Sequence, residues 1–337
     1  MTITDERGAA VPARVYLTGP EGAPVLPEGA IGYDKVRSDA QQEQHFVPAA
    51  LGACNLVGLA NNHFWRSGFY AGPWGAWPDH MLREYPKTCS RFAMAGFEMY
   101  YALLNAGFVL SPSAGSISGV HPVPPGWSRV YVHVDGKLTP KRWFDGVESG
   151  HSFVTTGPML LLTVDGHAPS EEISGGAFPR RVRAEVTMLS TAPVTSAEVV
   201  VNGDVHPVPL VAVAGSPRTY KGSVELTIEG TAWLAARWLA ENVHTCNLAH
   251  TAPVYIHNGD APVPLKRREL QYLLGRTEAL IKEVETGLQQ DSGEPTTIVT
   301  PNAGVKEETL RLFREARAIY AEKHRTASPA AADAPPR

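Results

Sequence analysis

The stretch from residue 104 to residue 158 constrains the fold most, because a small polar loop separates two strand-like apolar runs. The runs are residues 108–110 and 129–134, and the loop, residues 113–122, holds two glycines, three serines and His121. Loops that leave a strand end are where α/β folds place ligand-binding groups. A tight turn that needs small residues is the simpler interpretation, and a ligand-binding loop around His121 is the alternative.

Composition narrows the class of protein. A chain of 337 residues with 43% hydrophobic content can bury at least one full core, and its length suggests two or three domains. The net charge of -4, without basic runs among aromatic residues, argues against a nucleic-acid partner. No long apolar span or signal peptide is visible, so we expect a cytoplasmic protein without membrane contact; export would need a signal lost upstream.

A second candidate site follows a short apolar run, residues 56–60, which is typical of a buried strand. The run ends in Asn61, Asn62 and His63, where an α/β sheet presents its ligands. His63 is therefore a candidate metal or substrate ligand, and a histidine that only caps the strand is the alternative. Trp65 opens an aromatic segment that could line a pocket for an apolar or ring-bearing ligand, or simply pack on its own domain.

Helical signals surround the central loop. Apolar spacing predicts a helix over residues 91–105 with Glu98 on a solvated face, and Gly107 stands where a C-cap belongs. Thr139 followed by Pro140 predicts the start of a helix that ends at Gly150. His151, directly after it, could reach the same face as the central loop.

The second half of the chain is β-rich and then helical. Residues 180–257 alternate between apolar and polar positions, and Asn202-Gly203 predicts a two-residue hairpin, so a sandwich of about seven strands is expected. His250 is a candidate contact at a domain interface. Beyond residue 264, apolar stripes predict two helices.

Several runs together resemble the CehA/McbA family of metallohydrolases, which is named for a carbaryl hydrolase and has a domain like the polymerase-and-histidinol-phosphatase (PHP) fold. The resemblance covers roughly residues 48–260, and the first hairpin resembles the family's N-terminal β-domain. The matching runs are residues 50–63, 100–108, 113–119, 129–133, 152–158 and 249–255. The resemblance implies a metal-centred α/β barrel that hydrolyses small molecules.

The chain departs from the family pattern at the metal ligands. It contains no His-x-His pair, and the family's late Gly-Ser-Asp motif is Gly115-Ser116-Ile117 here. We infer that a block is missing at the junction near residue 48: the rest of the β-domain and the first half of the barrel. A hydrolytic metal site needs about three protein ligands, whereas His63 and His121 survive, with Glu98 or His151 as helpers.

The expected fold is therefore a partial PHP-like α/β barrel with an all-β sandwich and a C-terminal helical pair. The expected divisions are a β-domain fragment (1–47), the half-barrel (48–158), the sandwich (159–260), the helical tail (261–325) and a disordered end (326–337). Half a barrel leaves sheet edges that another chain or a rearrangement must cover, so a homo-oligomer is one expectation.

The resemblance implies a hydrolase of small esters, amides or carbamates that uses zinc or a similar divalent metal held by His63 and His121. Arg129 with the Ser116 and Ser118 hydroxyls would steady the oxyanion, and Asn62 and Trp65 would contact substrate. A serine hydrolase is excluded, because Ile117 stands where a nucleophile elbow has serine. The alternatives are a hydrolase relative inactivated by its missing ligands, and a non-catalytic binding or assembly module, such as a saccharide-binding one.

Overall fold

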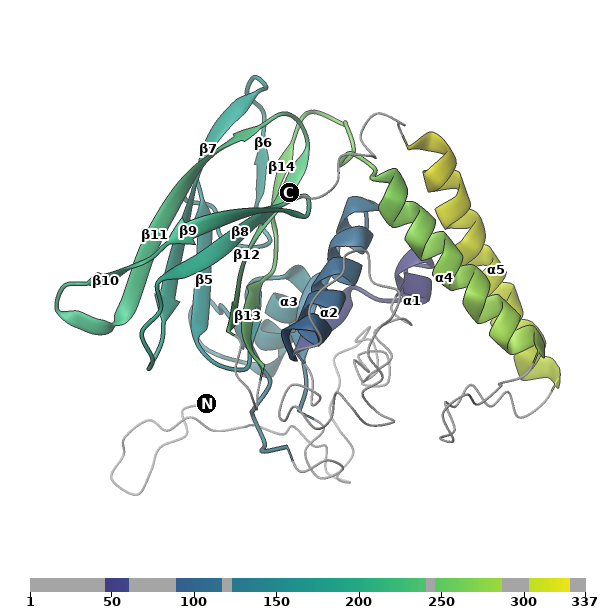
Figure 1. Ribbon diagram of the computed structural model, residues 1–337, viewed down its shortest axis with the longest axis horizontal. Helices are drawn as coiled ribbons and strands as arrows, with labels where there is room; N and C mark the ends of the chain where they lie inside the picture. Colours follow the sequence, from purple (N-terminus) through teal and green to yellow (C-terminus); the bar gives the residue numbers. More distant parts are fainter. Residues whose placement is uncertain (1–45, 61–88, 117–122, 241–245, 287–302, 328–337) are drawn as a thin grey trace.

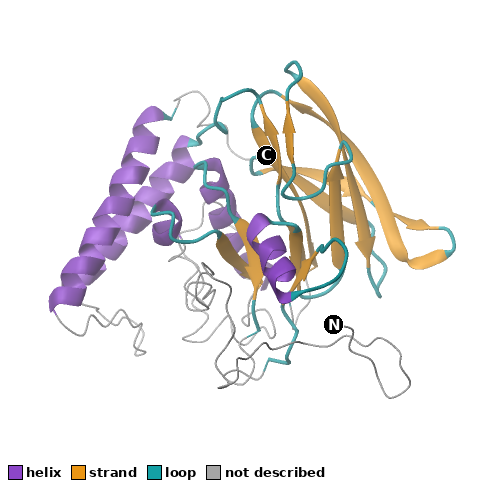
Figure 2. Ribbon diagram, turned by 180° about the vertical axis from the view of Figure 1, so that it is seen from behind, coloured by secondary structure: helices purple, strands orange, loops and turns teal. Residues whose placement is uncertain are grey.

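The computed structural model describes residues 46–60, 89–116, 123–240, 246–286 and 303–327, and shows a mixed α/β protein with several sheets and a few helices (Figures 1 and 2). Within these residues no barrel closes. A pair of long helices lies on one side, a short parallel sheet with its helices lies in the middle, and two larger sheets lie on the other side.

The short sheet is a β-α-β unit. Strands β1 (Leu56–Ala60) and β2 (Ser111–Ala114) pair in parallel, and helix α2 (Cys89–Asn105) lies between them in the sequence. The helix is followed by Gly107 with a φ of 85°, as the C-cap prediction requires. The strand expected over residues 108–110 was placed too early, because this run leads into β2 and packs Phe108 edge-on against Tyr320 of the distant helix α5.

The two larger sheets have eight and four strands. The eight-stranded sheet contains β3 (Arg129–Val132), β4 (Ser152–Thr155), β6 (Glu172–Ser174), β8 (Ser196–Val201), β9 (Asp204–Pro209), β12 (Ala232–Ala240), β13 (Asn247–Thr251) and β14 (Val254–His257). The four-stranded sheet contains β5 (Met159–Val164), β7 (Arg180–Leu189), β10 (Val211–Val213) and β11 (Ser216–Ile228). Strands β3 and β4 precede residue 158 yet pair within the eight-stranded sheet, through β13.

The predicted hairpin at Asn202-Gly203 is present and joins β8 to β9. Both turn residues have positive φ, 49° and 88°, as this turn requires. A two-residue loop makes Val201 and Asp204 the hydrogen-bonded pair, so by alternation the nitrogens of Pro207 and Pro209 point away from β8. The two prolines therefore leave this edge strand with fewer donors for unwanted pairing.

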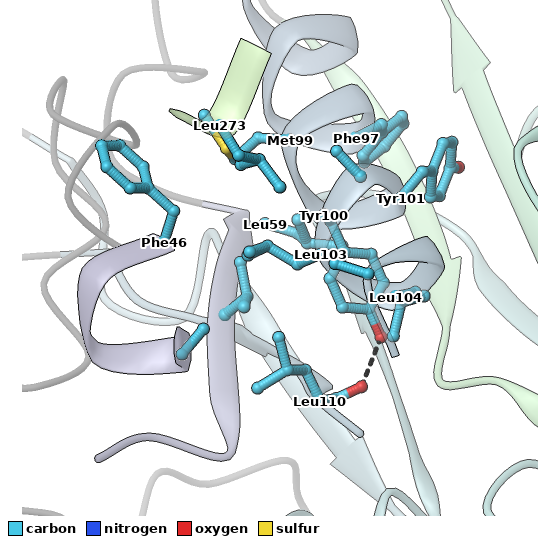
Figure 3. Close-up of a cluster of buried hydrophobic side chains, with 14 of the residues drawn as sticks. Phe46, Leu59, Phe97, Met99, Tyr100, Tyr101, Leu103, Leu104, Leu110 and Leu273 are labelled. Atoms are coloured by element: carbon cyan, nitrogen blue, oxygen red, sulfur yellow. Dashed lines mark hydrogen bonds between the residues drawn. The ribbon is translucent and has the colours of Figure 1, made fainter. Parts of the chain in front are cut away.

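The eight-stranded sheet has a hydrophobic core on each face. Along β12, Leu234 and Ala236 face the four-stranded sheet, whereas Trp233 and Ala235 face α2. Figure 3 shows the second of these cores around α2, where the Tyr100 hydroxyl donates to the Leu110 carbonyl at 2.7 Å. Because side chains alternate along a strand, successive residues of β12 belong to different cores.

The helices beyond the sheets form where the sequence predicts them. Helix α3 (Pro140–Ser149) has the expected caps: Thr139 Oγ1 accepts from the Arg142 amide at 3.3 Å, and Gly150 has a φ of 84°. Helices α4 (Arg267–Thr286) and α5 (Ala303–Thr326) pack together. The Tyr320 hydroxyl of α5 donates to the Phe46 carbonyl of α1 (Phe46–Ala50) at 2.6 Å, which ties the helical pair to the start of the β-α-β unit.

Gly222 offers a direct test of how the two larger sheets join. The chain passes from one sheet to the other between β9 and β10, and a Cβ on Gly222 of β11 would overlap the Pro209 carbonyl oxygen. Because the obstacle is backbone, we expect Gly222→Ala to destabilise the protein by about 1–3 kcal/mol. The urea midpoint measures this.

Gly230→Ala is the matched control, since nothing lies within 4 Å of a Cβ at Gly230. It should leave the midpoint nearly unchanged. Equal midpoints for the two variants would show that β9 and β11 do not approach each other in this way.

Candidate functional site

The candidate site lies at the carboxyl ends of β1 and β2, which are hydrogen-bonded neighbours. Ala60 pairs with Ala114, and the Gly115 amide donates to the Ala60 carbonyl at 2.9 Å. Parallel strands of an α/β fold present their ligand-binding groups at this edge. The two segments that carry the predicted ligands therefore begin side by side.

Five predicted site residues lie in these segments, outside the residues that the structure describes. Three follow β1 and two follow β2; they are Asn62, His63, Trp65, Ser118 and His121. Their roles as metal ligands and substrate contacts stay predictions. The described residues contribute Ser116 and Arg129.

Ser116 is fully buried, directly after β2. Its Oγ accepts from the Ser128 amide at 3.0 Å and lies 3.4 Å from the Ser128 carbonyl, to which it donates. The hydroxyl thus fastens the start of the central loop to the residue before β3. Its proposed contact with an oxyanion stays a prediction.

Arg129 holds two backbone segments together. Its guanidinium donates to the Gly126 carbonyl at 3.0 Å and to the Gly157 carbonyl at 2.9 Å, and lies 5.9 Å from the centre of the Tyr131 ring. Its Nε is also buried, without a hydrogen-bond partner among the described residues. The side chain is therefore rigidly placed, and its action on a substrate stays a prediction.

The structure also gives the surroundings of two further candidate ligands, Glu98 and His151. Glu98 was expected on a solvated face, which is wrong: it is only 7% exposed, because β1, β12 and α4 surround α2. His151 follows Gly150, which lies against Ser111 at the opposite end of β2 from Ala114. Within the described part of the chain, no group of three or more histidine, cysteine, aspartate or glutamate side chains is placed to hold a metal ion.

A buried polar cluster that the sequence did not reveal joins α2 to the eight-stranded sheet. The Tyr101 hydroxyl of α2 lies 2.9 Å from His250 Nε2, and His250 Nδ1 lies 2.7 Å from the Thr251 carbonyl oxygen. A carbonyl can only accept, so Nδ1 carries the ring proton and Nε2 accepts from the Tyr101 hydroxyl. His250 thus stands at an interface between layers.

Arg237 completes this cluster from β12. Its Nη1 donates over a long 3.5 Å to the Tyr101 hydroxyl, and its Nε donates to Glu198 Oε2 at 2.6 Å. Burial lowers the pKa of His250 to about 3 and raises the pKa of Tyr101 to about 12, because a dry contact disfavours the charged forms. Both rings are therefore neutral at pH 7, beside a charged guanidinium.

Asn105, one helical turn beyond Tyr101, forms a second polar contact. Its Oδ1 accepts from Trp233 Nε1 at 2.8 Å, and its Nδ2 donates to the Asn202 carbonyl at 3.0 Å and to Glu269 Oε2 at 2.9 Å. One amide therefore ties α2 to β12, to the β8–β9 turn and to α4.

The two clusters position α2, and Tyr101 and His250 are both buried within the protein. The chemistry of the candidate site would depend on the residues that follow the carboxyl ends of β1 and β2. Comparison of the chain with models of protein families, with curated proteins and with solved structures found no match. In the described residues no helix is long and apolar enough to cross a membrane.

Asn105→Ala tests the structural role of the second cluster. The change leaves the Trp233 indole N–H, the Asn202 carbonyl and the Glu269 carboxylate with one partner fewer, so we expect a loss of about 2–4 kcal/mol in the free energy of unfolding. Asn55→Ala is the control, because among the described residues the Asn55 side chain donates to Glu148 alone, in a hydrogen bond that is exposed to solvent. It should cost less than about 0.5 kcal/mol in the same urea experiment. Equal losses would contradict the role of Asn105.

Proposed function

We propose that this chain is a metal-dependent hydrolase of small esters, amides or carbamates, with its site at the carboxyl ends of β1 and β2. One observation carries the proposal: these ends are adjacent, and the segments containing His63 and His121 start from them. A site at this edge matches the way parallel α/β folds build their ligand sites. It also agrees with the resemblance of these same runs to CehA/McbA metallohydrolases.

The finer architecture belongs to the same proposal. The β1-α2-β2 unit would be part of a PHP-like half-barrel, and the two larger sheets would be the accompanying β-sandwich. Helices α4 and α5 pack on α1 and α2, which supports a helical tail that covers the half-barrel. A small-molecule substrate, rather than a nucleic acid, suits the slightly acidic composition.

Each proposed site residue would have a separate role in hydrolysis. A zinc or similar divalent ion activates water for attack on a carbonyl carbon, and His63 and His121 would hold that ion. Arg129, whose position is fixed by two carbonyls, would bring positive charge toward the oxyanion together with the Ser116 and Ser118 hydroxyls. Asn62 and Trp65 would contact the substrate.

A non-catalytic binding or assembly module is the second candidate. Two positions favour this alternative. Glu98 is buried among the elements that pack around α2, and His151 follows Gly150, which lies at the end of β2 opposite Ala114. In this alternative the histidines are structural, and the two larger sheets with the helical pair α4 and α5 provide the binding surface.

Metal content and turnover distinguish the two candidates. We expect the purified full chain to bind a stoichiometric divalent metal, to hydrolyse a chromogenic ester, and to lose both with a chelator. His63→Ala and His121→Ala should each remove the metal and the activity, because two imidazoles leave no spare ligand.

His133→Ala is the matched control, since the His133 side chain is 72% exposed and its Nε2 pairs with Asp135 at 3.3 Å. It should retain metal and turnover. Unchanged metal uptake in both His63→Ala and His121→Ala would contradict the hydrolase proposal. A metal-free chain that still unfolds cooperatively would support the second candidate.

A further inference from the structure

The contact between α2 and the eight-stranded sheet differs in chemistry from the contact between the two larger sheets. Among the described residues, the buried side chains of the core between the sheets include no ionisable group. The core around α2 lies beside buried ionisable groups: Glu98, Tyr100 and Tyr101 from α2, Arg237 from β12, His250 from β13, and Tyr255 from β14, with Glu198 of β8 paired to Arg237 at the rim. The stability of the contacts on the two faces of the eight-stranded sheet should therefore depend differently on pH.

We propose that α2 and the sheet form an acid-sensitive joint, which opens when His250 takes up a second proton while the two larger sheets stay packed. This proposal rests on the joint itself and is independent of the hydrolase assignment. Opening would release the helix that connects β1 to β2.

The hydrogen bonds at His250 explain why the second proton is disruptive. Nδ1 already donates to the Thr251 carbonyl, and Nε2 accepts from the Tyr101 hydroxyl. If Nε2 carried a proton, its N–H would face the O–H of Tyr101. Both groups would then be donors, so the Tyr101 hydroxyl would have to turn away. Arg237 adds a second obstacle, because its guanidinium lies 5.8 Å from the centre of the Tyr101 ring and would stand near an imidazolium in a dry contact.

Packing leaves little room for another arrangement. The His250 ring lies 5.0 Å from the centre of the Phe97 ring, 5.7 Å from that of Tyr100 and 5.7 Å from that of Tyr101. Figure 3 shows Phe97 and Tyr101 on the same side of α2. Three rings of the helix therefore enclose the imidazole, and water can reach it only when the helix moves.

The sign of the effect follows from linkage. Burial depresses the pKa of His250 to about 3 in the folded chain, whereas an open, hydrated histidine has a pKa near 6.5. The open state therefore binds more protons below about pH 6.5, and the joint weakens as the pH falls from there toward 3. For one such group the opening equilibrium should increase about 25-fold between pH 7 and pH 5.

Native-state hydrogen exchange of the full chain, read by mass spectrometry, tests the joint. Labelling times are scaled so that intrinsic exchange is equal at pH 7 and pH 5. We expect peptides of α2 to lose about 25-fold in protection at pH 5, and peptides of β7, β11 and β13 to change by less than about 3-fold, because β13 stays paired with β4 and β12. Parallel loss in all four elements, or no loss in α2, would overturn the proposal.

His250→Gln identifies the group responsible, because its amide can donate and accept without titrating. In this variant α2 protection should change by less than about 3-fold between the two pH values. His133→Gln is the matched control, being the same substitution at an exposed position, and should behave as the wild type. A His250→Gln chain that still loses α2 protection as the wild type does would contradict the proposal.

Should His250→Gln fail to fold, ¹⁵N spectra of histidine-labelled wild-type protein decide instead. A His250 ring that carries its proton on Nδ1 at pH 7, and becomes charged only together with the loss of α2 protection, supports the joint. A ring that becomes charged while α2 stays protected contradicts it.

Discussion

The packing of α2 against the eight-stranded sheet is the contact on which the rest of this structure depends. The helix is buried on the faces toward β1, β12 and α4, so it fills the space between the short parallel sheet and the large one. Without it, Trp233 and the other apolar residues on that face of the sheet would meet water. The same helix packs on β1, which pairs with β2, and the ends of these two strands carry the candidate site.

Polar side chains give this apolar contact a single register. Tyr101 and Asn105 lie four residues apart on α2, and their partners Arg237 and Trp233 lie four residues apart on β12. Each buried donor or acceptor left unpaired would cost about 1–3 kcal/mol, so a slipped helix would lose several partners at once. The helix is thus held by shape and by hydrogen bonds together.

Local signals in the sequence predicted local structure well, and long-range contacts account for what they missed. Thr139, Pro140 and Gly150 bound a helix, and Asn202-Gly203 makes a hairpin, because backbone geometry alone decides these cases. Glu98 was misplaced because β1, β12 and α4 all pack around α2, and the Tyr101–His250 contact was unseen because these two residues lie 149 positions apart. An apolar spacing also cannot tell a half-buried helix from one enclosed on several sides. For the site, the sequence placed the end of β1 correctly but ended the second strand at residue 110, before β2 begins, and the pairing of Ala60 with Ala114 shows that the two strand ends are neighbours.

We propose that this shared strand edge gathers His63 and His121 around one metal ion. X-ray absorption of the zinc-loaded full chain tests it most directly, because imidazole rings scatter in a recognisable pattern. The account predicts two imidazole nitrogens at about 2.0–2.1 Å from zinc, both lost in the His63→Ala His121→Ala double variant. A zinc shell made only of oxygen atoms, or one that keeps its imidazoles in that variant, would contradict it.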